Sequence, residues 1–294
     1  MPLHEVVYAA IAVWLFALGA SIGSFLNVVV YRVPEGMSLI RPGSHCPACK
    51  TPIRWFDNLP ILGWIALRGR CRDCGAWISP QYPIVEALTA TMFLGLGLVE
   101  CLAGGSNLPP RAIRLPDAVV FVAAQPAELA AVYVFHLLLL CTLLAAALIG
   151  RGGSRPGPRL FLPALAIGVL APIAFPSLRP VAAVPGLGGW MAGSIDGAAG
   201  LATGTVLGLI ASRLAPGQQA WGILLGSACV GLFLGWQAAV AVVGLTIGVC
   251  LVRLACGRFL PLRLSDLAMA WLTAAALAWI LAWSSLVKGL PFPG

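Results

Sequence analysis

The stretch CPACKTPIRWFDNLPILGWIALRGRCRDC, residues 46–74, contains two Cys-x-x-Cys pairs, Cys46/Cys49 and Cys71/Cys74, with 21 residues between them. The tight spacing within each pair lets two thiolates bind one ion, and the two pairs together supply the four sulfurs of a tetrahedral zinc site. Four sulfurs close the coordination shell and leave no position for a substrate. We therefore expect the zinc to hold this segment folded without taking part in chemistry.

The segment around these cysteines, residues 32–82, is polar, basic and rich in Pro, Gly and Trp, whereas the rest of the chain is strongly apolar. Over all 294 residues, 60% are hydrophobic and 10% are charged, and the mean hydropathy is +0.95. These values exclude an ordinary soluble domain and indicate a protein of the lipid bilayer. A polar segment of this length between apolar ones is typical of a functional loop.

Eight apolar stretches have about the length that crosses roughly 30 Å of hydrocarbon as a helix. They are residues 6–30, 83–102, 129–149, 160–176, 190–211, 218–235, 236–254 and 265–287. We predict an all-α polytopic membrane protein with about eight transmembrane helices and a zinc-ribbon-like loop domain. Its predicted parts are a first transmembrane helix at 1–31, the four-cysteine module at 32–82 and a transmembrane helical domain at 83–294.

The basic residues, 18 against 10 acidic ones, indicate how the chain is oriented in the membrane. If the amino terminus lies outside, 14 of the 18 fall in cytoplasmic segments, as the positive-inside rule requires. The basic surplus then needs no nucleic-acid partner. The same orientation places the cysteine pairs in the reducing cytoplasm, where zinc is favoured over disulfides.

Three further stretches carry a family resemblance: GASIGSFLNVVVYR at 19–32, NLPILGW at 58–64 and ISPQYPIVE at 78–86. Together with the cysteine pairs they resemble the prepilin leader peptidase/N-methyltransferase family. The resemblance implies a bacterial inner-membrane enzyme that removes the leader peptide from type IV prepilins or type II secretion pseudopilins. It also implies methylation of the new amino terminus with S-adenosylmethionine, and cleavage by two intramembrane aspartates that act as base and acid.

The chain departs from the family where those aspartates are expected. The family motifs around the two positions place the first at Gly150 and the second at Ile223. No acidic residue occurs from 129 to 195 or from 197 to 265. Because neither Gly nor Ile can bind or activate water as an acid or base, we do not expect cleavage by the mechanism of the family.

Two other acids, Asp196 and Asp266, are considered as substitutes for the missing aspartates. Asp196 falls toward the external end of its span, where a polar helix contact is the simpler interpretation and catalysis is the alternative. Ser265 and Asp266 precede the last span, and this order is typical of a helix N-cap. Asp266 also has the membrane depth that a catalytic residue would need.

The first of two functional hypotheses is enzymatic, with the methyltransferase activity retained. In the relatives, a Gly-Lys or Gly-Arg pair directly before the third cysteine is tied to methylation. In this chain the pair is Gly69 and Arg70, which the resemblance therefore indicates as cofactor-binding residues. A turn followed by a solvated charge is the alternative interpretation. Asn27 and Glu86 flank the module and are further candidates for contact with cofactor or substrate, with a polar contact at a helix end as the alternative interpretation. S-adenosylmethionine as the cofactor rests on the resemblance alone.

The second hypothesis is a peptidase-dead homologue that binds prepilins or assembly components through the zinc module and the spans. The missing aspartates beside an intact module favour it. A transporter is a weaker third hypothesis, because the sequence shows no paired intramembrane charges that would line a path.

Overall fold

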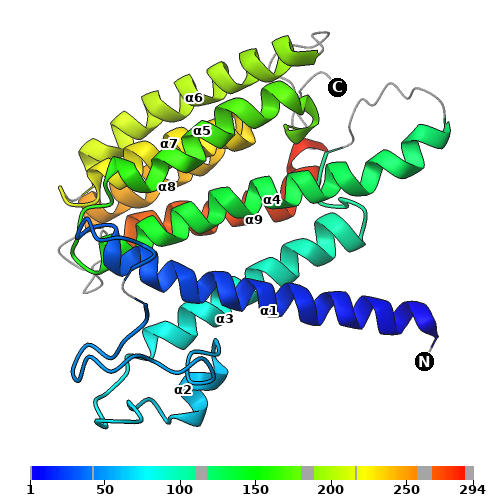
Figure 1. The fold of residues 1–294 in the computed structure, drawn as a ribbon. Helices are drawn as coiled ribbons and strands as arrows, with labels where there is room; N and C mark the ends of the chain where they lie inside the picture. Colours follow the sequence, from blue (N-terminus) through cyan, green and yellow to red (C-terminus); the bar gives the residue numbers. More distant parts are fainter. Residues whose placement is uncertain are drawn as a thin grey trace. The chain divides into compact units, whose positions relative to one another are not determined.

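The computed structural model describes residues 2–41, 43–109, 118–179, 189–215, 217–256 and 267–288. In these ranges the regular structure is helical, and strand-like pairing is confined to two isolated bridges. The prediction of an all-α membrane protein is thereby confirmed. The chain divides into two compact units, Met1–Leu98 and Val99–Gly294, whose helices are labelled in Figure 1.

The first unit contains α1 (Leu3–Arg32), α2 (Leu62–Ala66) and α3 (Gln81–Leu96), and the π-helix η1 (Gly97–Leu102) follows at its end. Glycines bring α1 against α3. A Cβ atom on Gly19 would lie 2.7 Å from the Phe93 side chain, and one on Gly23 would lie 2.7 Å from the Cα of Glu86. The two glycines are four residues apart on one face of α1, the small-xxx-small arrangement that lets membrane helices approach closely.

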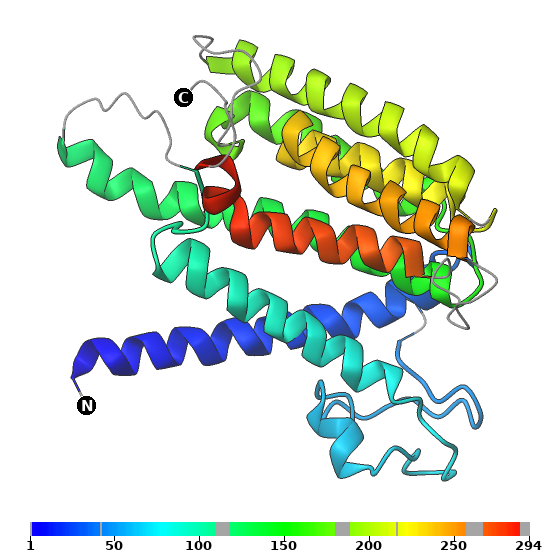
Figure 2. The ribbon, with the colours of Figure 1, turned by 180° about the vertical axis from the view of Figure 1, so that it is seen from behind.

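The second unit contains the remaining helices. They are α4 (Ala118–Arg151), α5 (Pro158–Ala174), the short 3₁₀-helix η2 (Pro176–Leu178), α6 (Gly189–Leu214), α7 (Ala220–Leu234), α8 (Trp236–Cys256) and α9 (Ala268–Lys288). The closest packing joins α6 to α7, where a Cβ on Gly200 or Gly231 would lie 2.0 Å from the carbonyl oxygen of the other. Figure 2 shows α9 running alongside α4, with which it is in contact.

In the described residues, all eight predicted apolar segments are mainly helical, and six of these helices are long and apolar enough to cross a membrane. The two shorter ones are α5, with 17 residues, and α7, with 15. At 1.5 Å per residue, α7 extends about 22 Å, which is less than the roughly 30 Å of a hydrocarbon core.

A buried arginine joins three helices of the second unit. Arg179 donates hydrogen bonds to the carbonyl oxygens of Gly168 in α5 at 2.8 Å, Gly193 in α6 at 2.7 Å and Leu232 in α7 at 2.8 Å. Asp196 is also buried and interacts electrostatically with this guanidinium, in keeping with a polar helix contact. The predicted N-cap at Asp266 lies outside the described residues.

Candidate metal centre and the pocket beside it

The four predicted ligand cysteines come together in the first unit. Their Sγ atoms all lie within 4.8 Å of one another, and the Sγ atoms of Cys46 and Cys74 are 3.8 Å apart. A tetrahedral zinc site with Zn–S bonds of about 2.3 Å requires sulfur separations of about 3.8 Å. All four cysteines are free thiols, so the cluster can hold one metal ion.

The two cysteine pairs form the same turn twice. In the first turn, the Lys50 N–H bonds the Cys46 carbonyl at 2.9 Å, and in the second the Gly75 N–H bonds the Cys71 carbonyl at 2.9 Å. Lys50 and Gly75 each follow the second cysteine of a pair, and both have left-handed backbones, with φ of 61° and 71°. The Cys-x-x-Cys spacing therefore folds into two equivalent knuckles that direct their sulfurs to one point.

Hydrogen bonds set the pKa values of three of these thiols. The Thr51 side chain and backbone lower the pKa of Cys49 to about 6, and the backbone N–H groups of Cys74 and Asp73 lower the pKa of Cys71. The Ala76 N–H alone would lower the pKa of Cys74, but the neighbouring Cys49 and the other thiols raise it to about 12. Because the thiolate is the form that binds metal, binding of the ion releases the protons that the thiols still carry.

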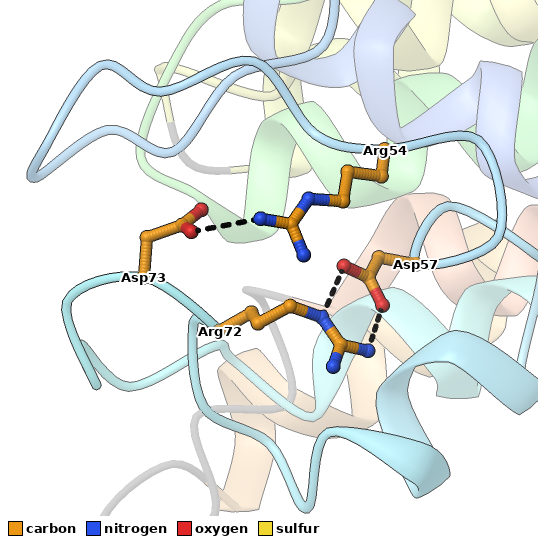
Figure 3. A network of polar contacts seen from close by, with 4 residues as sticks. All are labelled: Arg54, Asp57, Arg72 and Asp73. Atoms are coloured by element: carbon orange, nitrogen blue, oxygen red, sulfur yellow. Dashed lines mark hydrogen bonds and ion pairs between the residues drawn. The ribbon is translucent and has the colours of Figure 1, made fainter.

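Two ion pairs fasten the intervening segment to the second knuckle (Figure 3). The Arg72 Nε donates a 2.8 Å hydrogen bond to one carboxylate oxygen of Asp57, and an Arg72 Nη2 donates to the other. Arg54 pairs with Asp73 at 3.3 Å, and the Arg72 guanidinium lies 5.5 Å from the centre of the Phe56 ring. The hydrogen bond from Arg72 lowers the pKa of Asp57, so the pair is charged at neutral pH.

Glu86 ties the loop of the module to α3. Its buried carboxylate, 7% exposed, accepts a 2.6 Å hydrogen bond from the Ile61 N–H. Ile61 has a φ of 64°, which is a strained value for a β-branched residue and persists only where its surroundings impose it. Asn27, the second flanking candidate, donates to the Tyr82 carbonyl at 3.2 Å. Asn27 thus connects α1 to the start of α3, and Glu86 connects α3 to the loop of the module.

The backbone conformation and the close packing at position 69 both require a glycine. Gly69 is buried with a φ of 69°, and a Cβ atom there would lie 2.9 Å from the Trp64 ring. The Trp64 indole in turn donates to the Ile78 carbonyl at 3.0 Å. Arg70 is exposed. The turn therefore needs a glycine, and the cofactor-binding role of Gly69 and Arg70 stays a prediction.

A pocket of about 400 Å³, which the sequence analysis did not identify, opens between α1 and the module loop. Its lining residues are Ser21, Ser24, Phe25, Val28, Arg32, Leu39, Ile40, Gly43, Ser44, Asn58 and Pro60. The α1 members recur at three- and four-residue intervals, which is the spacing of one helix face, and this was the signal available in the sequence. Ser24 also hydrogen-bonds the Glu86 carboxylate, so the pocket adjoins the Glu86–Ile61 contact.

The two positions predicted for aspartates, Gly150 and Ile223, both adjoin Gln219 in the second unit. A Cβ on Gly150 would lie 3.5 Å from the Gln219 side chain, and the Ile223 N–H donates to the Gln219 carbonyl at 2.9 Å. Ile223 is fully buried. The two positions therefore both adjoin one side chain, and their correspondence to the aspartates of the family stays a prediction.

Comparison with known proteins gives a family match in the amino-terminal part of the chain. The bacterial peptidase A24 N-terminal domain matches residues 17–99. A prepilin leader peptidase/N-methyltransferase of Myxococcus xanthus is 55% identical over 82 residues, which cover 28% of this chain and 24% of that protein. One from Klebsiella pneumoniae is 47% identical over 90 residues, covering 29% of this chain and 40% of that protein.

An Escherichia coli protein described as a type 4 prepilin-like proteins leader peptide-processing enzyme is 46% identical over 109 residues, covering 31% of this chain and 40% of that protein. The chain thus matches well under half the length of these relatives. No solved structure matches the chain.

Proposed function

Because residues 17–99 form an N-terminal domain of the prepilin leader peptidase/N-methyltransferase family, we propose that the chain acts on the amino termini of prepilins or pseudopilins as a methyltransferase. In this proposal it does not itself remove leader peptides through an aspartate dyad. The residues that carry the family's similarity also build the metal centre, the Glu86 anchor and the pocket. This colocation supports an activity that resides in the first unit.

The pocket beside the metal centre is the observation that carries the proposal. Its volume of about 400 Å³ lies within the usual range of small-molecule sites, about 300–1,000 Å³. Apolar Phe25 and Val28 lie along the same helix face as the hydroxyls of Ser21 and Ser24. The buried Glu86 carboxylate, linked to the pocket through Ser24, gives this region a negative group that attracts a positively charged amino terminus.

The cofactor expected from the family fits the pocket residues. The Arg32 guanidinium brings a positive charge for a carboxylate. The Ser21 and Ser24 oxygens can accept hydrogen bonds, and Phe25 offers an apolar surface. When bound, S-adenosylmethionine supplies an electrophilic methyl group. The residues of this chain would hold it and orient the amino terminus toward it.

A structural zinc ion at the four cysteines would keep the pocket in shape. Four thiolates leave the ion no open position, so its role is to fix the two knuckles and, through the Asp57 and Arg72 pair, the loop that leads to Ile61. The positive-inside distribution of Lys and Arg supports a cytoplasmic module and an external amino terminus, in the inner membrane of a bacterium.

A second candidate, a homologue that binds prepilins or assembly components without modifying them, is favoured by one observation. The positions expected for the aspartates, Gly150 and Ile223, carry no carboxylate and both adjoin Gln219. A chain that has lost cleavage can retain binding, since binding and catalysis depend on different groups.

The deciding experiment uses the purified full chain, loaded with zinc in lipid nanodiscs, with prepilin or pre-cleaved pilin and with or without S-adenosylmethionine. Intact mass reports the outcome. We expect a gain of one methyl on pre-cleaved pilin and no loss of leader. Loss of the leader would refute the absence of cleavage, and binding of pilin without methyl gain would establish the binding-only candidate. Cleavage that begins in a Gly150→Asp/Ile223→Asp variant would establish the dyad positions.

A further inference from the structure

A buried polar cluster lies in the second unit, whereas the metal centre and its pocket belong to the first. The His136 Nδ1 lies 2.7 Å from Oε1 of Glu100, and Asn107 Nδ2 donates to the same oxygen at 3.1 Å. Glu100 and His136 are 0% exposed and Asn107 is 3% exposed. The sequence showed no paired charges that would line a path through the spans, and here two ionisable groups of two spans meet.

The cluster lies inside helices that are candidates for membrane crossing. Glu100 belongs to the span Gln81–Leu102 and His136 to the span Ala127–Arg151. Ionisable side chains at such positions are costly, and they mark functional sites by default. Glu100 also lies in the π-helix η1, a rare conformation found frequently at functional sites.

The hydrogen bonds fix which way the amide of Asn107 faces. Its Nδ2 donates both to Glu100 Oε1 and to the Ile280 carbonyl in α9 at 3.0 Å. Both partners are acceptors, so the amide nitrogen faces Glu100 and Ile280, and Oδ1 faces away from them. Because Glu100 Oε1 already accepts from the amide, it is the ionised form of the carboxylate that best accepts from His136 as well.

Three polar atoms of the cluster have no hydrogen-bond partner among the described residues, although all three are buried. They are Glu100 Oε2, Asn107 Oδ1 and His136 Nε2. Two are acceptors, and the third is a donor when the imidazole is protonated. A bare cation would be repelled by the donor and an anion by the carboxylate. Water molecules, each of which can both donate and accept, match such a mixed set of atoms, and buried waters typically make about three hydrogen bonds.

We propose that Glu100, Asn107 and His136 form an intramembrane water-binding site, with one proton held between Glu100 and His136 as an imidazolium–carboxylate pair. Such a pair has no net charge, which limits the cost of its burial in the bilayer. The site also holds the segment after η1 against α9, because the Ser284 N–H donates to the Asn107 carbonyl at 2.7 Å. This inference goes beyond the proposed methyltransferase, which resides in the other unit.

The test is nuclear magnetic resonance of the full chain in lipid nanodiscs with ¹⁵N-labelled histidine. The chain has three histidines, and the His136 signals are those that disappear in His136→Gln and persist in His4→Gln. We expect both ring nitrogens to be protonated at neutral pH and magnetisation to pass from water to the ring. A ring with one protonated nitrogen, or a ring that receives no magnetisation from water, would overturn the proposal.

A second comparison isolates the shared proton. In Glu100→Gln the ring is expected to lose its second proton at neutral pH, whereas in Glu5→Gln, at the exposed start of α1, it is expected to keep it. A ring that remains doubly protonated in Glu100→Gln would overturn the pairing. Should Glu100→Gln not fold, the water contact and protonation state of the unaltered protein still decide the proposal.

Discussion

The guanidinium of Arg72, inside the second cysteine pair, donates two parallel hydrogen bonds to the carboxylate of Asp57, which lies 15 residues earlier in the chain (Figure 3). Bidentate arginine–carboxylate pairs add geometric specificity to charge. The contact sets the distance between the second knuckle and the loop that ends at Ile61. This contact thereby links the metal centre to the pocket, although none of the four cysteines lines the pocket.

Removal of this bidentate contact is expected to loosen the module. Arg72→Gln should lower the midpoint of thermal unfolding of the zinc-loaded protein and speed the loss of zinc to a chelator. Arg54→Gln is the matched control, because Arg54 makes one 3.3 Å contact at a more exposed site, and exposed pairs contribute little. Equal effects of the two substitutions would contradict the special role of Arg72.

The same pair predicts a dependence of stability on pH. Arg72 lowers the pKa of Asp57, so the stabilisation is fully present above the ordinary aspartate pKa of about 3.9 and is lost as the pH falls through the lowered value. Asp57→Asn is expected to remove this part of the acid sensitivity. Unfolding midpoints measured from pH 7 to pH 3, with metal-free protein as the reference for zinc release, check it. If the unfolding midpoints of the unaltered protein and of Asp57→Asn change in parallel with pH, the prediction is refuted.

The metal centre predicts about one zinc ion per chain. Cys49→Ser and Cys74→Ser should each lower the measured zinc content of the purified protein and expose the module to proteolysis. Cys250→Ser, a buried cysteine in α8 far from the cluster in sequence, should leave zinc content unchanged. Metal content by mass spectrometry gives the answer, and a zinc-free protein with an intact module would rule the site out.

The Glu86 anchor predicts a difference between two substitutions. Glu86→Gln keeps an oxygen that accepts from the Ile61 N–H, whereas Glu86→Leu leaves that N–H unpaired, at a cost of about 1–3 kcal/mol. We expect Glu86→Leu to lower the unfolding midpoint further than Glu86→Gln. Both should reduce methyl transfer, because both remove the negative group beside the pocket. Full methyl transfer by Glu86→Gln would show that the charge has no part in it.

Filling the pocket is expected to block the first unit's activity without unfolding it. Ser21 lines the pocket, and Ser21→Phe should lower methyl transfer about tenfold or more, the effect of losing about 1.4 kcal/mol of binding. Val13→Phe places the same side chain at an exposed position of α1 that does not line the pocket and should leave transfer unchanged. The rate of methyl gain by mass spectrometry compares the two. Equal rates would place the site elsewhere.

The elements that the sequence predicted well are those set by short-range patterns. The Cys-x-x-Cys spacing predicted a four-sulfur cluster because each knuckle closes within five or six residues. The apolar stretches predicted helices because a helix satisfies its backbone within its own segment. The predicted spans at 160–176 and 218–235 correspond to the two shorter apolar helices, α5 and α7. The end of α7 could not be placed from the sequence because only Gly235 separates it from α8.

The sequence by itself therefore determined that the chain is a helical membrane protein with a four-cysteine module. Tertiary structure alone decided that Glu100 meets His136, that Asn107 reaches Ile280 across 173 positions, and that Arg179 caps carbonyls of three helices. The reason is physical: an apolar span gives the same local signal whichever helix it packs against. Which polar side chains meet inside the bundle depends on the close approach of backbones, which is set only when the helices pack together.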